Sequence, residues 1–266
     1  MKDGSLIPRF GRARRDPELA VLEGFHPLKH ALRFGAQLLE VVTSDGDGLE
    51  RLAAELAPDL HAQIRSLAHT VDETIFNQLS PFAPSTGVIS LAERPAIDLR
   101  ALLGDRRASP IVLLEDPRDL GNMGACVRVA AAADIAGVLS TGSHDPWHPD
   151  ALRGAAGLHF ALPVARLAEL DGRRGLEALK GVGRPLIALD PDGEELDPAR
   201  IPPRAILAFG TERQGLSEEL KRRADARLSI PMRAGVSSLN LATSVAAVLF
   251  ARPLAFTPRR PAPEES

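Results

Sequence analysis

Short apolar runs alternate with helical segments between residues 110 and 255, and this alternation limits the possible folds more than any other feature of the chain. Five runs of four or five residues predict strands, at Ile111–Glu115, Gly137–Ser140, Pro185–Leu189, Ala205–Phe209 and Arg227–Ile230. Runs of this length are typical of parallel strands that helices cover on both faces. Helices are expected at residues 122–134, 166–180, 216–223 and 238–252. The pattern predicts a doubly wound α/β domain over residues 110–255.

A smaller α/β unit is predicted ahead of this domain, over residues 19–94. Helical spacing of apolar residues occurs at 26–34 and 48–56, and short strand-like apolar runs occur at 38–43 and 87–91. The mixture of the two periodicities within one short segment favours a single compact unit with its own sheet.

Three segments outside these two units are expected to lack regular structure. They are a flexible basic lead-in over residues 1–18, a linker over residues 95–109 and a C-terminal tail over residues 256–266. The lead-in carries four arginines between glycine and proline residues, so it is either a solvated tail or an arm that contacts RNA.

The composition excludes several classes of protein. A single cysteine excludes an internal disulfide and a thiolate-cluster zinc site, and it favours a cytoplasmic location. No apolar run approaches the roughly 20 residues that a membrane span needs. A net charge of −3 is not the basic balance of many nucleic-acid-binding domains, although it leaves room for a local basic patch. Only four of the 32 basic residues are lysines. Arginine suits planar phosphate contacts, but the base composition of the gene would explain the same bias.

The first candidate site segment is Glu115–Arg128, which runs from the end of a predicted strand through a glycine-containing turn into a helix. Ligands in open α/β sheets bind at the carboxyl ends of the strands, where this turn is expected. Asn122 is predicted to cap the helix, since its side chain can accept hydrogen bonds from the first N–H groups. Arg128 lies six residues further on, and it is either a site residue or an ordinary surface arginine.

The second candidate segment is Phe209–Leu216, which also begins at the end of a predicted strand. Gly210 and Gly215 would let the backbone approach a ligand closely, and Glu212 lies between them. The segment lacks the Lys-Ser/Thr of a phosphate-binding loop, so by itself it is weak evidence for a site.

The third candidate segment is Ser229–Asn240, which leads from the last predicted strand into the final helix. Ser237 or Ser238 is predicted to cap that helix, and Asn240 offers polar groups at its first turn. Simple capping would explain the two serines equally well.

In this order, the three segments resemble the motifs of the SpoU (TrmH-like) family of RNA ribose methyltransferases, in the SPOUT superfamily. The matching patterns are N-x-G-x-x-x-R at Asn122–Arg128, F-G-x-E-x-x-G-L at Phe209–Leu216, and S-I-P-M followed by S-S-L-N at Ser229–Asn240. The N-terminal EGFHPLKHAL and STGVISL are similar to the ribosomal-protein-like substrate-binding domain of that family. The resemblance therefore covers residues 19–252.

The resemblance implies an α/β fold with a SPOUT-type parallel sheet and a C-terminal trefoil knot. The small α/β ribosomal-protein-like unit over residues 19–94 would bind the substrate RNA, and the enzyme would be a homodimer without a metal. S-adenosylmethionine would be bound largely by backbone groups, at Gly210, Ile230 and Leu239. The catalytic residues implied by position are Asn122, Arg128, Glu212, Ser238 and Asn240.

The main hypothesis is methyl transfer from S-adenosylmethionine to a ribose 2′-hydroxyl of rRNA or tRNA in the cytoplasm. One alternative is an RNA-binding or assembly factor that keeps the fold without turnover, and another is methylation of a base within the same superfamily. Transfer to a hydroxyl needs in-line positioning and a place for the proton. The sequence places no histidine near the motifs except His144 and His148, which are interpreted as surface residues of a loop.

Overall fold

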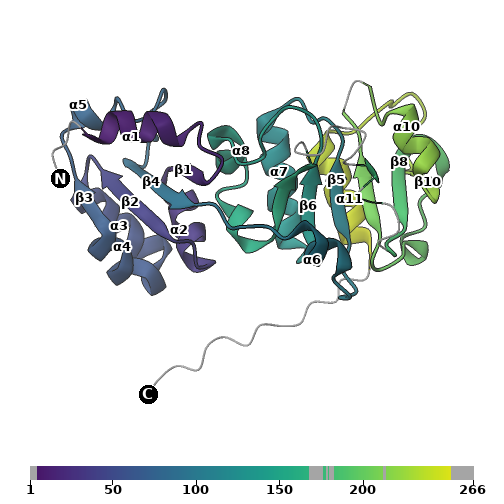
Figure 1. The fold of residues 1–266 in the computed structure, drawn as a ribbon, viewed down its shortest axis with the longest axis horizontal. Helices are drawn as coiled ribbons and strands as arrows, with labels where there is room; N and C mark the ends of the chain where they lie inside the picture. Colours follow the sequence, from purple (N-terminus) through teal and green to yellow (C-terminus); the bar gives the residue numbers. More distant parts are fainter. Residues whose placement is uncertain (1–4, 168–175, 178, 180–182, 212–213, 253–266) are drawn as a thin grey trace, which may run out of the picture.

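The computed structural model describes residues 5–167, 176–177, 179, 183–211 and 214–252 of the chain. Two sheets form two lobes that lie side by side (Figure 1). The N-terminal lobe, residues 5–93, has a four-stranded sheet in the order β1-β4-β2-β3. The C-terminal lobe, residues 99–252, has a six-stranded sheet in the order β10-β8-β9-β5-β6-β7.

The N-terminal sheet is mixed, because β4 pairs antiparallel with both β1 and β2, whereas β3 pairs parallel with β2. Its strands are β1 (Leu19–Glu23), β2 (Leu38–Thr43), β3 (Ala68–Thr70) and β4 (Val88–Glu93). Its helices are α1 (Leu6–Ala13), α2 (Phe25–Arg33), α3 (Gly46–Leu56), α4 (His61–Leu67) and α5 (Glu73–Phe76), with a 3₁₀ turn at Pro58–Leu60.

Helix α1 contradicts the prediction of a flexible lead-in over residues 1–18. Leu6, Phe10 and Ala13 are spaced to share one face of this helix, and all three are buried. They pack in one cluster with Val21 of β1 and Phe76 of α5, so burial of this face against the sheet orders the segment. Residues 1–4 lie outside the described part of the chain.

The C-terminal sheet is parallel throughout, and the five predicted strands are all present. Its strands are β5 (Ile111–Leu114), β6 (Gly137–Ser140), β7 (Val164–Arg166), β8 (Leu186–Glu195), β9 (Ile206–Phe209) and β10 (Ala226–Ser229). The sequence did not predict β7, a three-residue strand at the edge of the sheet. The helix predicted over 166–180 falls mostly outside the described residues, and Arg166 belongs to β7.

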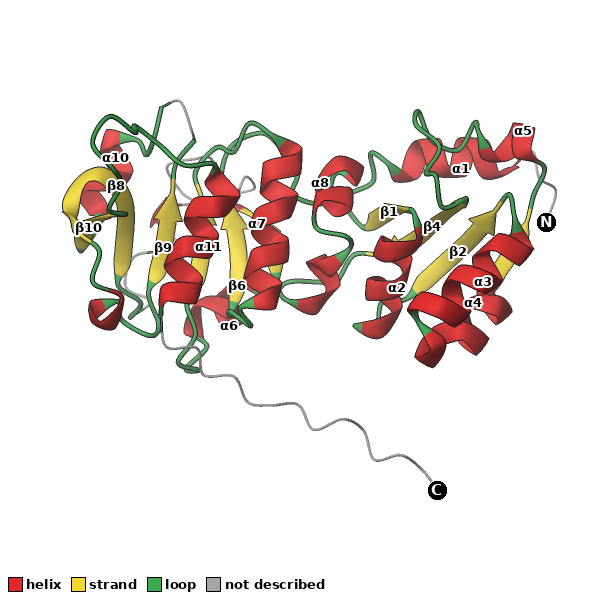
Figure 2. Cartoon of the chain, turned by 180° about the vertical axis from the view of Figure 1, so that it is seen from behind, coloured by secondary structure: helices red, strands yellow, loops and turns green. Residues whose placement is uncertain are grey.

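Helices cover both faces of this sheet. They are α6 (Leu99–Gly104), α7 (Leu120–Ala132), α8 (Pro149–Gly154), α10 (Glu218–Arg223) and α11 (Leu241–Ala251), with 3₁₀ turns at Leu158–Ala161 and Pro198–Arg200. Helices α7 and α11 lie next to each other on one face, in front of the sheet in Figure 2. Helices α6 and α10 pack on the opposite face.

Helix α6 contradicts the prediction of a linker over residues 95–109. Leu102 and Leu103 are buried in the same cluster as Ile111 and Leu113 of β5. The buried Arg184 guanidinium then fixes the turn after α6, since it donates to the carbonyl oxygens of Leu103 at 2.9 Å and Asp105 at 2.8 Å. The segment is therefore part of the C-terminal lobe.

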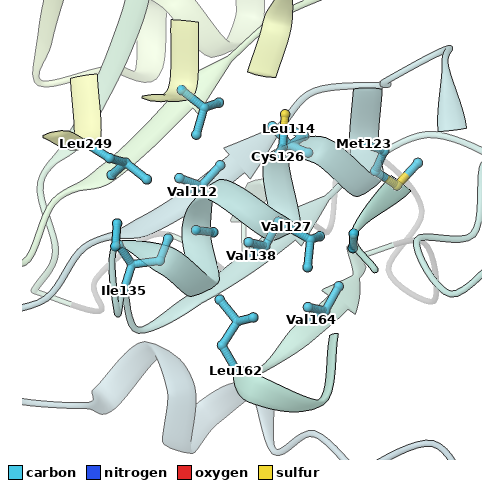
Figure 3. Close-up of a cluster of buried hydrophobic side chains, with 14 of the residues drawn as sticks. Val112, Leu114, Met123, Cys126, Val127, Ile135, Val138, Leu162, Val164 and Leu249 are labelled. Atoms are coloured by element: carbon cyan, nitrogen blue, oxygen red, sulfur yellow. The ribbon is translucent and has the colours of Figure 1, made fainter. Parts of the chain in front are cut away.

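The core on the α7 side of the sheet brings together residues that are far apart in the sequence (Figure 3). It includes Val112 and Leu114 of β5, Cys126 and Val127 of α7, and Leu249 of α11. The Cys126 thiol is fully buried and packs here as an apolar side chain. Burial of the inner face of α7 fixes the helix that carries the first candidate segment.

Helix α8 lies between the two lobes and joins them (Figures 1 and 2). Arg153 of α8 and Arg14, which follows α1, both donate to the buried carboxylate of Glu23 at 2.6 Å, and the Ser80 hydroxyl donates to it at 2.7 Å. Burial opposes ionisation of Glu23, but these three hydrogen bonds hold its pKa below the ordinary 4.5. A paired, buried charge of this kind fixes the position of α8 against the N-terminal lobe.

Among the described helices, none is both long and apolar enough to cross a bilayer. The described residues also contain no group of three or more His, Cys, Asp or Glu side chains arranged to hold a metal ion.

Candidate active site

A cavity of about 440 Å³ opens at Leu189 of β8 and Phe209 of β9, where the pairing of these two strands ends, beside the segment that joins β10 to α11. Its walls include the three residues expected to contact the cofactor, Gly210, Ile230 and Leu239, as well as Ser238 from the expected catalytic set. Apolar side chains from four different segments complete it, namely Leu189, Phe209, Met232 and Leu241. Segments two and three of the sequence analysis therefore meet at one site.

Gly210 is required by the turn itself. A Cβ atom on this residue would lie 2.0 Å from the carbonyl carbon of Gly215 and 2.3 Å from the amide nitrogen of Leu216. The turn is closed by the Gly215 N–H, which donates to the Thr211 carbonyl at 2.9 Å, and Gly215 has a left-handed φ of +64°. The close approach that excludes a side chain at position 210 is thus an approach to the backbone of this turn. Glu212 lies outside the described residues.

The first and third segments are joined by two asparagines. The Asn240 side-chain amide donates to the Asn122 side-chain oxygen at 2.9 Å. Asn240 lies between Leu239 and Leu241, both of which line the cavity, so the pair stands at the edge of the cavity. Two residues of the expected catalytic set, far apart in sequence, are in direct contact.

The helix caps differ from those predicted. Asp119, and not Asn122, caps α7, because the Asp119 carboxylate accepts from the Asn122 N–H at 2.6 Å. Asn240, and not Ser237 or Ser238, caps α11, because its side-chain oxygen accepts from the N–H groups of Ala242 and Thr243. The side chains of Asn122 and Ser238 are therefore not used as caps.

Asp190 adds an acidic group to the cavity that the sequence analysis missed. It follows the apolar run of β8 and is 4% exposed. Its carboxylate accepts a hydrogen bond from the Arg227 guanidinium at 3.0 Å and forms an ion pair with Lys221 at 3.5 Å. Burial opposes its ionisation, but the Asp192 N–H and the two cations hold its pKa below 3.8. The only sequence signal was an acidic residue directly after a predicted strand.

Arg128 lies on an exposed part of α7 and is not among the residues that line the cavity. The pKa of His26 of α2, in the N-terminal lobe, is lowered mainly by partial burial, and the charges of Lys29 and Arg128 add to this effect. The sequence analysis placed no histidine near the motifs, and His26 corrects it. The docking of the lobes, which brings α2 and α7 against the same 3₁₀ turn at Leu158–Ala161, has no signature in the local sequence.

A model of the SpoU rRNA methylase family matches residues 109–250, which hold this whole cavity. The chain belongs to this family. The recognition made from the three motifs is thereby confirmed.

Relatives that are named as RNA methyltransferases match most of the chain. A 23S rRNA (adenosine(1067)-2′-O)-methyltransferase of Streptomyces azureus is 28% identical over 249 residues, which cover 90% of this chain and 88% of that protein. An uncharacterized tRNA/rRNA methyltransferase of Mycobacterium bovis is 32% identical over 212 residues, 77% of this chain and 72% of that protein.

Solved structures share the fold of both lobes. The SpoU methyltransferase AviRb of Streptomyces viridochromogenes is 25% identical, with a TM-score of 0.70 over 92% of this chain and 95% of that chain. AviRb has also been solved in complex with the cofactor AdoMet, which is S-adenosylmethionine.

Proposed function

We propose that this protein transfers a methyl group from S-adenosylmethionine to a ribose 2′-hydroxyl of rRNA or tRNA. The observation that carries the proposal is that the second and third family motifs line one cavity, while the first contacts the third through the Asn122–Asn240 hydrogen bond, in a chain that belongs to the SpoU rRNA methylase family. The Streptomyces azureus relative, which is named a 23S rRNA 2′-O-methyltransferase, favours a ribose over a base and an enzyme over a binding factor.

The cavity fits S-adenosylmethionine. Leu189, Phe209, Ile230 and Leu241 provide the apolar walls that an adenine ring needs, and the backbone around Gly210 is held open by its tight turn. Asp190 and Lys221 supply both signs of charge, which suits a ligand with ammonium, sulfonium and carboxylate groups. When bound, the cofactor supplies an electrophilic methyl group.

The polar residues around the cavity would hold the ribose. The Asn122–Asn240 pair presents side-chain amide groups beside Leu239, and Ser238 adds a hydroxyl that is free of any capping role. Together they can orient the 2′-hydroxyl toward the cavity, which is the main requirement of an in-line transfer. Glu212 belongs to this set by its position in the motif.

Arg128 is assigned a clamping role. A guanidinium has five N–H donors in a planar fork and no acceptor, which matches a phosphate oxygen pair and is poorly suited to taking a proton. Binding of the adjacent phosphate would fix the ribose whose hydroxyl reacts.

The course of the chain supports a trefoil knot in the C-terminal lobe. Strand β10 lies at one edge of the sheet, whereas α11, the next element, packs beside α7 over its centre. The connecting segment lines the cavity together with the turn after β9, so it passes alongside that loop. Threading of the connection through the loop would make the cavity part of the knot.

The N-terminal unit over residues 19–94 is assigned to RNA selection, and α11 to a homodimer interface. Phe250 of α11 is 48% exposed, and Thr243 on the same helix is also exposed, although most of this helix is apolar. A second chain that packs on this face and on the neighbouring α7 would cover both. The cytoplasmic location remains a prediction.

The test is a methyl-transfer assay with labelled S-adenosylmethionine on rRNA and tRNA, followed by nucleoside mass spectrometry. A 2′-O-methylated nucleoside is expected. A methylated base would replace the proposal by the base-methylation alternative. Binding of RNA without transfer, by a preparation that binds S-adenosylmethionine, would favour the factor without turnover.

A further inference from the structure

Helix α2 carries two basic side chains of the N-terminal lobe toward Arg128 of the C-terminal lobe. His26 and Lys29 are three residues apart, so they lie on neighbouring positions of one helix face. Partial burial is the main cause that lowers the pKa of His26, and the charges of Lys29 and Arg128 add to it. The geometry agrees, because helix α2 and helix α7, which carries Arg128, both pack against the 3₁₀ turn Leu158–Ala161.

The position of α2 is fixed by contacts with the C-terminal lobe. The His30 ring nitrogen Nδ1 lies 2.7 Å from the carbonyl oxygen of Ala156, and Pro27 is buried against the next residue, Gly157. A Cβ atom on Gly157 would lie only 2.6 Å from the Pro27 Cα, so backbone meets backbone here. This close fit fixes the backbone of α2 against the C-terminal lobe, so the helix face with His26 and Lys29 has a defined position relative to that lobe.

The three basic groups are not neutralised within the described residues. No ion pair joins His26, Lys29 or Arg128 to a carboxylate there. Asp59 is the one carboxylate whose charge is felt at Lys29, but it already pairs with Arg33 at 2.6 Å. The charges of Lys29 and Arg128 therefore disfavour a proton on His26, and an anion beside them would reverse this effect.

We propose that His26, Lys29 and Arg128 together bind one phosphate of the substrate RNA, so that both lobes hold the strand beside the methylated ribose. The inference rests on the proposed function and adds two residues of the N-terminal lobe to its site. A phosphodiester fits because it carries one negative charge and oxygens that accept from guanidinium, ammonium and imidazolium donors together. The carboxylate of the cofactor is a poorer candidate, since none of the three residues lines the cavity.

A bound phosphate reverses the electrostatic balance at His26. In the free protein, burial, Lys29 and Arg128 all favour the neutral imidazole, and His30 on the next turn is a further titratable neighbour. A phosphate between these groups favours the protonated imidazole, so the complex takes up a proton. The affinity for RNA therefore increases as the pH falls from 8 to 6.

The experiment measures the dissociation constant for deproteinised 23S rRNA at pH 6, 7 and 8 and at several salt concentrations. For the wild type, binding is expected to tighten about five- to tenfold from pH 8 to pH 6. His26→Gln should remove most of this pH dependence, and Lys29→Gln should lower the salt slope by about 1. The matched controls are His61→Gln and Arg65→Gln on α4, in the same lobe, which should behave as the wild type.

Cofactor affinity, measured by calorimetry, should be unchanged in all four variants and shows that each is folded. The proposal is overturned if His26→Gln keeps the full pH dependence, or if Lys29→Gln has the same salt slope as Arg65→Gln. Methylation by the wild type is measured on the same RNA. If neither rRNA nor tRNA is methylated, the proposed function itself fails, and this result is separate from the binding comparison.

Discussion

His159 gives the C-terminal lobe a sensitivity to acid that can be calculated from its surroundings. The imidazole is fully buried beside Trp147, its Nε2–H donates to the Pro146 carbonyl at 2.8 Å, and Nδ1 has no hydrogen-bond partner among the described residues. Burial is the main cause that lowers its pKa from 6.5 to about 4, and the hydrogen bond and Asp145 oppose it only in part. A proton on Nδ1 would face no acceptor.

The sign and the size follow from proton linkage. The unfolded chain binds a proton at His159 below pH 6.5, whereas the folded chain binds it only near pH 4. The neutral imidazole therefore stabilises the fold above pH 6.5, and this stability is lost as the pH falls from 6.5 to 4. The loss is about 3 kcal/mol in full and about 2 kcal/mol at pH 5, at about 1.4 kcal/mol per pKa unit.

Urea unfolding followed by fluorescence tests this value, because Trp147 is the only tryptophan and its ring centre lies 5.1 Å from that of His159. The comparison variant is His159→Gln, whose amide can still donate to the Pro146 carbonyl but does not titrate. Between pH 7.5 and pH 5 the wild type should lose about 2 kcal/mol more of its free energy of unfolding than the variant. Equal losses in the two proteins would refute the conclusion that His159 stays neutral in the folded protein.

Three further predictions concern the candidate site and the assembly. In Gly210→Ala, the new Cβ should displace the backbone of Gly215 and weaken S-adenosylmethionine binding at least about tenfold in calorimetry. The control Gly11→Ala, where a Cβ meets nothing within 4 Å, should bind the cofactor as the wild type does. Equal binding would remove the turn from the site. Arg128→Ala should reduce the methylation rate at least about 100-fold while its affinity for the cofactor stays within about twofold of the wild type. If the variant methylates at the wild-type rate, Arg128 has no role in the reaction. Light scattering of the wild type should give twice the mass of one chain, and Phe250→Glu should lower the measured mass toward that of a single chain. A monomeric wild type at micromolar concentration would contradict the proposed interface.

The strands of the C-terminal lobe could be predicted because the sheet is covered on both faces. Every residue of β5 is buried, so the whole strand is apolar and stands out from its surroundings. The same local pattern fails for β7 at the sheet edge, since its three residues include the exposed Arg166. It also fails for α1, whose buried face of Leu6, Phe10 and Ala13 is interrupted by arginines and a proline.

The site could be predicted only as far as it is local in sequence. Gly210 could be placed beside a cavity because it directly follows the end of a strand, and Leu239 of the third motif lines the same cavity. The caps were wrong because they depend on where the backbone leaves the helical conformation, which differs by two or three residues from the sequence pattern. His26 could not be found at all, since its proximity to Arg128 depends on how two separately folded sheets dock.

The position of α11 in the core has a consequence for synthesis on the ribosome. Leu249 packs with Val112 and Cys126, so the central core of the C-terminal lobe stays incomplete until residue 249 has left the exit tunnel. The N-terminal sheet, by contrast, is complete once residue 93 has emerged, because all four of its strands precede that point. Nascent chains of intermediate length would thus carry a finished first lobe beside exposed parallel strands, which is the stage at which a chaperone would be needed most.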